Sequence, residues 1–150
     1  MKIGIGNDHA ATEMKKEIMK YLQNQGYEVV NYGTNTNESC DYPIYGEKVA
    51  LAVKNHEVDE GVLICGTGIG ISLAANKVPG IRAASVSETV SARLAKEHNN
   101  ANIIAFGARI VGIEEAKAIV SAFLNAKFQG GRHKIRVDII DEIDKRDHKE

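Results

Sequence analysis

Residues 61–77 read GVLICGTGIGISLAANK, and this stretch decides the fold that the sequence predicts. The apolar run 61–65 is typical of a short strand that is buried on both faces. Three glycines follow within residues 66–70, and helical periodicity begins directly after them. A buried strand that passes through a glycine-rich turn into a helix indicates a parallel sheet whose strands are connected by helices.

The rest of the chain repeats this alternation of short apolar segments and amphipathic segments. Further strands are expected at residues 2–6, 27–32, 81–86 and 102–106. Helices are expected at residues 11–25, 44–55, 71–77, 88–97 and 113–125, with a last one from about Arg132 whose end is expected to fray. The pattern predicts a three-layer α/β/α Rossmann-like sandwich with a five-stranded parallel sheet, and 150 residues fit a single domain, 1–150.

Composition argues against several classes of partner. Nineteen Lys and Arg stand against twenty Asp and Glu, so the chain lacks the basic field of a nucleic-acid binder. No apolar run reaches the ~18 residues of a membrane span, and the N-terminal apolar stretch is too short for a signal peptide. The two cysteines form no Cys-x-x-Cys pair, which fits a reducing compartment. We therefore expect a cytoplasmic protein that binds neither nucleic acid nor membranes.

The glycine-rich loop 66–70 lies where parallel α/β sheets bind ligands, beyond the carboxyl ends of the strands. Its backbone N–H groups can converge on an anion, and the helix that follows adds positive potential. Ile71 stands where the dinucleotide fingerprint requires a third glycine, and no Gly-Lys-Ser/Thr of a P-loop follows. The loop predicts an anion site, with a nucleotide as the weaker expectation.

Cys65 is the main candidate for chemistry, because the N-terminus of a helix favours the thiolate form of a nearby cysteine. It could serve as a base or a nucleophile, and the alternative is a small buried apolar residue at a strand end. Cys40 lies in a polar loop, and we assign it no role.

Asp8 and His9 follow the first strand, although a helix cap and a surface position explain them equally well. His98 follows a helix whose C-terminus stabilises imidazolium, as a proton donor requires, and a simple cap is the alternative. Arg132 and Arg136 are one helical turn apart.

Two such arginines can bind a phosphate dianion, and a solvated charged face is the alternative. Glycines at 130 and 131 let this helix approach another surface, and Arg109 is a further phosphate candidate.

Taken together, these motifs resemble the ribose-5-phosphate isomerase B family, to which galactose-6-phosphate isomerase subunits are related. The resemblance covers nearly the whole chain. The segments that carry it are NDHA (7–10), ESCDYP (38–43), ICGTGIGISLAANK (64–77), EHNNANIIAFG (97–107), RIVG (109–112) and GGRHKIRV (130–137).

The resemblance implies an isomerase that interconverts ribose 5-phosphate and ribulose 5-phosphate through a 1,2-enediolate, a step of the non-oxidative pentose phosphate pathway, without a metal or another cofactor. It implies that Cys65 is the base, that Thr67 assists it, and that His98 opens the sugar ring. The enediolate would be held by the amides of Gly66, Thr67, Gly68, Ile69 and Gly70. The remaining contacts would come from Asp8 and Asn99 to sugar hydroxyls, Tyr42 to the pocket wall, and His9, Arg109, Arg132 and Arg136 to the phosphate.

The resemblance also implies a homodimer, or a tetramer made of two such dimers, in which the neighbour supplies the His98 and arginine segments. Ile135, Ile139 and Ile143 form a stripe that is expected to pack on this partner subunit. One alternative is an isomerase of six-carbon sugar phosphates such as allose or galactose 6-phosphate, which differs only in pocket length. The other is a non-catalytic phosphate- or nucleotide-sensing module, against which the combination of Cys65 and His98 argues.

Overall fold

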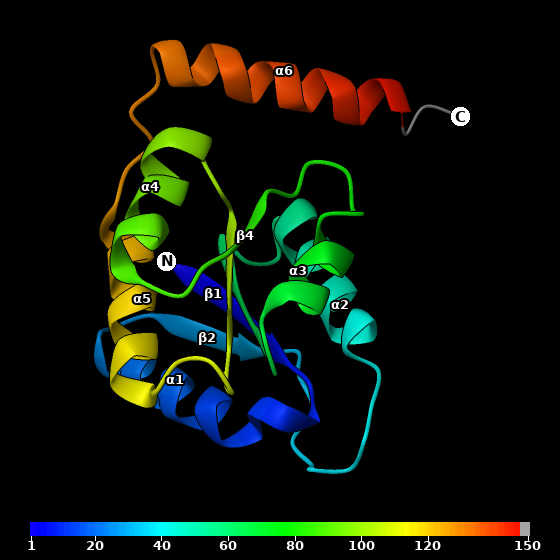
Figure 1. The fold of residues 1–150 in the computed structure, drawn as a ribbon, viewed down its shortest axis with the longest axis vertical. Helices are drawn as coiled ribbons and strands as arrows, with labels where there is room; N and C mark the ends of the chain where they lie inside the picture. Colours follow the sequence, from blue (N-terminus) through cyan, green and yellow to red (C-terminus); the bar gives the residue numbers. More distant parts are fainter. Residues whose placement is uncertain (148–150) are drawn as a thin grey trace.

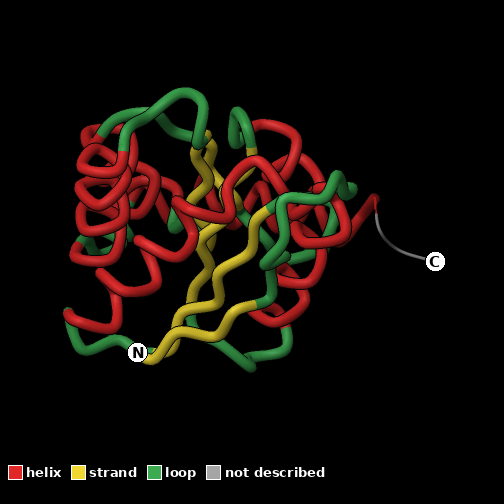
Figure 2. The backbone as a smooth tube through the Cα atoms, turned by 90° about the horizontal axis from the view of Figure 1, so that it is seen from below, coloured by secondary structure: helices red, strands yellow, loops and turns green. Residues whose placement is uncertain are grey.

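Five parallel strands form the middle layer of the molecule, in the order β2-β1-β3-β5-β4. The structure, a computed structural model, describes residues 1–147. The strands are β1 (Lys2–Asn7), β2 (Glu28–Asn31), β3 (Glu60–Cys65), β4 (Ala83–Ser85) and β5 (Ile103–Gly107). Figure 2 shows this layer between two layers of helices. The predicted parallel α/β sandwich is confirmed.

Two hydrophobic cores, one on each face of the sheet, hold the layers together. The helices are α1 (Thr12–Asn24), α2 (Tyr42–Lys54), α3 (Ile69–Ala75), α4 (Thr89–Asn99), α5 (Ile113–Asn125) and α6 (Arg132–Asp147), with a 3-10 turn η1 (His9–Ala11) before α1. In β3, Val62 and Ile64 belong to the core with α1, α4 and α5, whereas Leu63 and Cys65 belong to the core with α2 and α3. The alternation of strand side chains therefore sets the direction of Cys65.

Several element bounds differ from the sequence prediction. Helix α2 begins two residues earlier than expected, with Pro43 in its first turn, where the missing N–H of proline does no harm. Helix α4 continues to Asn99, so His98 lies inside its last turn. The predicted strand 81–86 is reduced to Ala83–Ser85 at the edge of the sheet.

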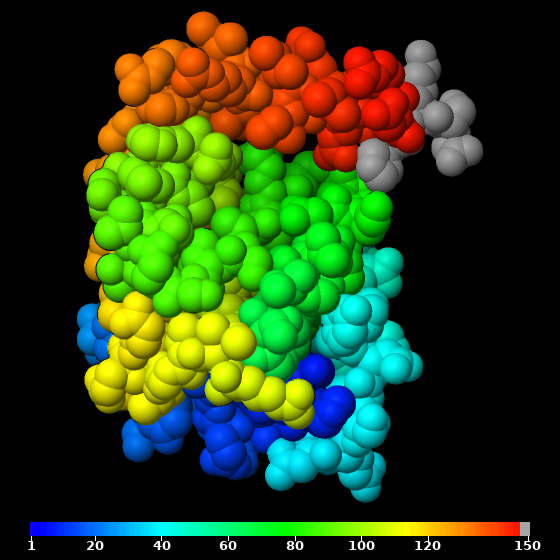
Figure 3. Space-filling view, in the orientation of Figure 1, coloured from blue at the N-terminus to red at the C-terminus, as the bar shows by residue number. Residues whose placement is uncertain are grey.

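Helix α6 crosses one end of the molecule, over α4 (Figure 1, Figure 3). The predicted fraying is wrong for residues 144–147, which continue the helix. Lys145 and Arg146 in the last turn complement the helix dipole there. The rest of the predicted frayed end, residues 148–150, lies outside the described residues. Within 1–147, no helix is long and apolar enough to span a bilayer.

Candidate active site

Cys65 lies at the carboxyl end of β3, where its side chain is 4% exposed. Its Sγ accepts the backbone N–H of Gly68 at 3.1 Å. A donor of this kind stabilises negative charge on sulfur, because the hydrogen bond strengthens when the acceptor is ionised. The predicted base thus has a backbone donor directed at its sulfur.

The loop between Cys65 and α3 is shaped by close contact with β5. Gly68 has a φ of +81°, and a Cβ there would lie 2.6 Å from the backbone of Phe106. A Cβ on Gly107 would likewise lie 2.6 Å from the backbone of Gly66 and Thr67. Real side chains do not approach backbone this closely, so the loop conformation depends on glycine at both places.

Two of the predicted anion-binding amides have partners within the loop. The Gly68 N–H donates to Cys65, and the Ile69 N–H donates to Thr67 Oγ1 at 3.2 Å. Thr67 itself is exposed. Cys65 and Thr67 thus accept hydrogen bonds from two consecutive amides. The predicted base and the residue predicted to assist it therefore lie in the same backbone turn.

Tyr42 and Arg109 flank the glycine loop on two sides. The Tyr42 ring covers Gly70, since a Cβ on that glycine would lie 2.5 Å from the ring. The Arg109 guanidinium lies beside Gly66, with Nη1 3.4 Å from the Cβ position of that glycine. An aromatic wall and a positive charge therefore border the loop that is predicted to hold an anion.

Asp8 and His9 lie at the same edge of the sheet. The Asp8 amide donates to the carbonyl of Ile64, one residue before Cys65, at 3.3 Å. Asp8 Oδ1 accepts the Ala10 N–H at 3.0 Å, so the plain reading as a helix cap holds in this structure. His9 Nδ1 accepts the Cys40 N–H at 3.2 Å, and Cys40 Sγ lies 3.7 Å from the same nitrogen.

Sequence reasoning missed Cys40, because the contact with His9 uses a backbone group that any residue type carries. It also missed Lys15, which is 1% exposed. The Lys15 ammonium donates to the Thr34 carbonyl at 2.7 Å and to Asn31 Oδ1 at 3.3 Å, and burial lowers the pKa of Lys15. Asn7 Nδ2 donates to the same Thr34 carbonyl at 3.1 Å. The loop after β2 is thereby fastened to the end of β1, beside Asp8.

The other predicted site residues lie at the opposite, amino edge of the sheet. Because α4 returns the chain from the end of β4 to the start of β5, its last turn, with His98 and Asn99, lies far from Cys65 along the strand direction (Figure 1). The His98 ring stacks on the ring of His133 in α6, with centroids 4.2 Å apart and planes inclined by 8°. Within one chain, the glycine loop therefore lies far from His98, Asn99, Arg132 and Arg136.

His133 lies between Arg132 and Arg136 in sequence on α6. Desolvation lowers the pKa of His133, and the neighbouring His98, Arg132 and Arg136 lower it further. The neutral form is therefore favoured near neutral pH. Positive charge at this end of α6 is carried by Arg132, Lys134 and Arg136, and the Lys134 ammonium is paired with Asp138 at 2.7 Å.

Across residues 1–147, no three His, Cys, Asp or Glu side chains come together in a group that could hold a metal ion.

Known proteins of similar sequence and fold identify the chain as an α/β sugar-phosphate isomerase. The model of the Ribose/Galactose Isomerase family matches residues 3–140, and the chain belongs to this family. Ribose-5-phosphate isomerase B of Escherichia coli K12 is 52% identical over 145 residues, which cover 97% of each chain.

Two solved structures show the same fold. Ribose-5-phosphate isomerase B of Clostridium thermocellum superposes with a TM-score of 0.96 at 57% identity, covering 97% of this chain and 99% of that one. The enzyme of Mycoplasma genitalium with bound ribulose-5-phosphate gives 0.92 at 42% identity, covering 96% of both chains.

Proposed function

We propose that the chain interconverts D-ribose 5-phosphate and D-ribulose 5-phosphate as an aldose–ketose isomerase. The observation that carries this proposal is Cys65 Sγ held 3.1 Å from the Gly68 N–H, at the mouth of a loop of backbone donors. The relatives described above, which bear the name ribose-5-phosphate isomerase B, support the substrate. An isomerase of six-carbon sugar phosphates is the less favoured alternative.

The reaction requires a proton to move from C2 to C1 of the open-chain aldose. The Cys65 thiolate takes the C2 proton, and the electron pair of the broken C–H bond forms the C1–C2 double bond of an enediolate. The same thiol returns the proton to C1, while the proton on O2 passes to O1 to leave the ketone. Thr67 lies beside this transfer and assists it.

The backbone donors of the glycine loop stabilise the charge that develops on the enediolate oxygen. A preorganised donor of this kind contributes about 2.7–4 kcal/mol to a transition state in comparable oxyanion holes. The donors are fixed before the substrate arrives, because the loop is pressed against β5 at Gly68 and Gly107. Asp8 and Tyr42 would orient the sugar from the side of β1 and α2.

Ring opening and phosphate binding need residues from the other edge of the sheet. We infer that a partner subunit brings its own His98, Asn99, Arg132 and Arg136 to the Cys65 loop, in a homodimer or in a tetramer made of two such dimers. The 45–64% exposure of Ile135, Ile139, Ile140 and Ile143 on α6 supports a covered surface there. His9 and Arg109 would complete the phosphate site from this chain. The cytoplasm remains the proposed compartment.

The direct test is ketose formation from ribose 5-phosphate by the purified protein, with allose 6-phosphate assayed in parallel. We expect turnover of the pentose and much weaker turnover of the hexose. In deuterium oxide the ribulose 5-phosphate should carry deuterium at C1, because the proton on sulfur exchanges with solvent, and we expect EDTA to leave the rate unchanged. Turnover of the hexose alone would overturn the proposal.

A further inference from the structure

Helix α6 carries Arg132 and Arg136 but has little apolar anchorage to its own chain. Among its described residues only Val137 is buried, at 4% exposure. The position of the two arginines relative to His98 and Asn99 therefore depends on polar contacts. The stacking of the His98 and His133 side chains is one contact between polar residues, and it lies at the start of the helix.

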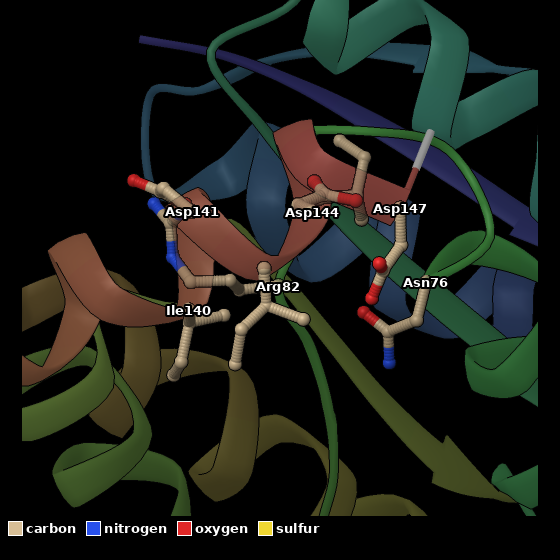
Figure 4. A pocket seen from close by; sticks show the side chains of 8 residues that line it. Asn76, Arg82, Ile140, Asp141, Asp144 and Asp147 are labelled. Atoms are coloured by element: carbon tan, nitrogen blue, oxygen red, sulfur yellow. The ribbon is translucent and has the colours of Figure 1, made fainter. Parts of the chain in front are cut away.

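A second polar connection lies eight residues further along α6, where Asp141 contacts Arg82. This arginine stands in the segment just before β4, and its side chain is 19% exposed. Its Nε donates to the carbonyl of Asn100 at 3.0 Å, and its Nη1 donates to Asp141 Oδ1 on α6 at 3.0 Å. One guanidinium thus joins the end of α4 to the middle of α6. Figure 4 shows Arg82 and Asp141 at the side of a cavity of about 310 Å³.

The backbone that carries Arg82 is itself held by hydrogen bonds. Its backbone N–H donates to Asn102 Oδ1 at 2.8 Å, and Asn102 Nδ2 donates to the Gly80 carbonyl at 3.0 Å. The Gly80 N–H in turn donates to Asp144 Oδ2 on α6 at 2.5 Å. The segment 80–82 therefore contacts α6 at two successive turns, through Asp141 and Asp144.

Asn100 is the residue that ends α4, in a left-handed conformation with φ of +47°. It directly follows His98 and Asn99. Among non-glycine residues, asparagine adopts this conformation comparatively often, and it is a common residue at the end of a helix. The hydrogen bond from Arg82 to the Asn100 carbonyl ties down this residue, which directly follows the two predicted site residues in the last turn of α4.

We propose that Arg82 is a positioning residue for the isomerase reaction, which keeps the His98–Asn99 turn of α4 in register with the arginines of α6. The inference rests on the proposed function of those residues. A guanidinium suits the task, since its planar fork directs donors to two acceptors at once, whereas a lysine offers a single nitrogen. Arg82 would act on the reaction only through the segments that it joins.

The test compares two ion pairs of the same helix. Asp141→Asn weakens the Arg82 contact, whereas the control Asp138→Asn breaks the Lys134–Asp138 pair, which spans 2.7 Å within α6 and joins it to nothing else. We expect Asp141→Asn and Arg82→Met to raise KM for ribose 5-phosphate about tenfold with kcat within about threefold, because uniform binding is lost. Asp138→Asn should keep the KM of the unmodified protein.

Three further measurements separate positioning from general stability. Inorganic phosphate should bind both variants more weakly in calorimetry, by a factor similar to that in KM. Arg82→Lys should restore only part of the loss in phosphate affinity. The double variant Arg82→Met/Asp141→Asn should bind phosphate no more weakly than Arg82→Met alone, since the Arg82–Asp141 contact is already lost in Arg82→Met. Should Arg82→Met fail to fold, Asp141→Asn alone decides.

A KM and a phosphate affinity for Asp141→Asn that equal those of Asp138→Asn would overturn the inference. Failure of the unmodified protein to isomerise ribose 5-phosphate would instead count against the proposed function. In that case phosphate calorimetry still tests whether Arg82 positions the anion site.

Discussion

The two ends of the sheet differ in how they hold their functional residues. At the carboxyl edge, Cys65 is buried and the glycine loop packs against β5 at Gly68, and the hydrogen-bond donors are backbone groups of fixed orientation. At the amino edge, Arg132 and Arg136 stand exposed on α6, a helix with one buried residue of its own. In the proposed reaction, the chemistry uses the rigid part of the fold. The recognition of phosphate uses a helix that is held by a few polar contacts and, as proposed above, by a second subunit.

The sharpest way to break this division is to remove the base. Cys65→Ala should lower kcat by at least about a thousandfold, because no other group takes the C2 proton. The same variant should still bind ribose 5-phosphate, since the phosphate ligands remain, and calorimetry should show it. Activity within about tenfold of the unmodified protein would show that Cys65 is not the base.

Substitutions at the amino edge of the sheet should change KM, whereas the substitution of Cys65 changes kcat. Replacing Arg132 or Arg136 by Ala should raise KM for the sugar phosphate about tenfold or more, because a charge-assisted hydrogen bond contributes about 1.5–3 kcal/mol to ground and transition states alike. Steady-state kinetics on ribose 5-phosphate measures this. An unchanged KM in both variants would show that these arginines do not bind the phosphate and belong only to a solvated surface.

Two glycines with positive φ allow the two edges to be compared by the free energy of unfolding. Gly68, at +81°, has the backbone of Phe106 within 2.6 Å of a Cβ position, whereas Gly130, at +67° ahead of α6, has nothing within 4 Å. Gly130→Ala should lower the free energy of unfolding by about 1 kcal/mol, from backbone strain alone. Gly68→Ala should lower it by about 2–4 kcal/mol, because the loop must also move. Urea unfolding measures both, and equal effects would contradict the rigid loop.

Local patterns in the sequence were enough to predict the alternation of strands and helices and the segment from Cys65 to Gly70. Both depend on neighbours within a few residues, such as the apolar run before the loop. The predicted helix 44–55 begins two residues after the start of α2, because proline is typical of loops as well as of the first turn of a helix. Strand order was not predicted, because each strand carries a similar apolar pattern whichever neighbours it has.

The residues that sequence reasoning missed act over long separations or through backbone groups. Arg82 and Asp141 are 59 residues apart, and Lys15 reaches Thr34 across 19. His9 meets the amide of Cys40, which no side-chain pattern reveals. Only the folded chain brings such pairs together, so they were predictable neither from spacing nor from residue type.

Subunit complementation tests the division between the two edges most directly. Cys65→Ala and the double variant Arg132→Ala/Arg136→Ala should each be nearly inactive at low substrate concentration. If one site takes Cys65 from one chain and the arginines from the next, each mixed dimer contains one intact site. An equal mixture, after subunit exchange, should then recover about a quarter of the activity of the unmodified protein. No recovery despite demonstrated exchange would contradict a site shared between subunits.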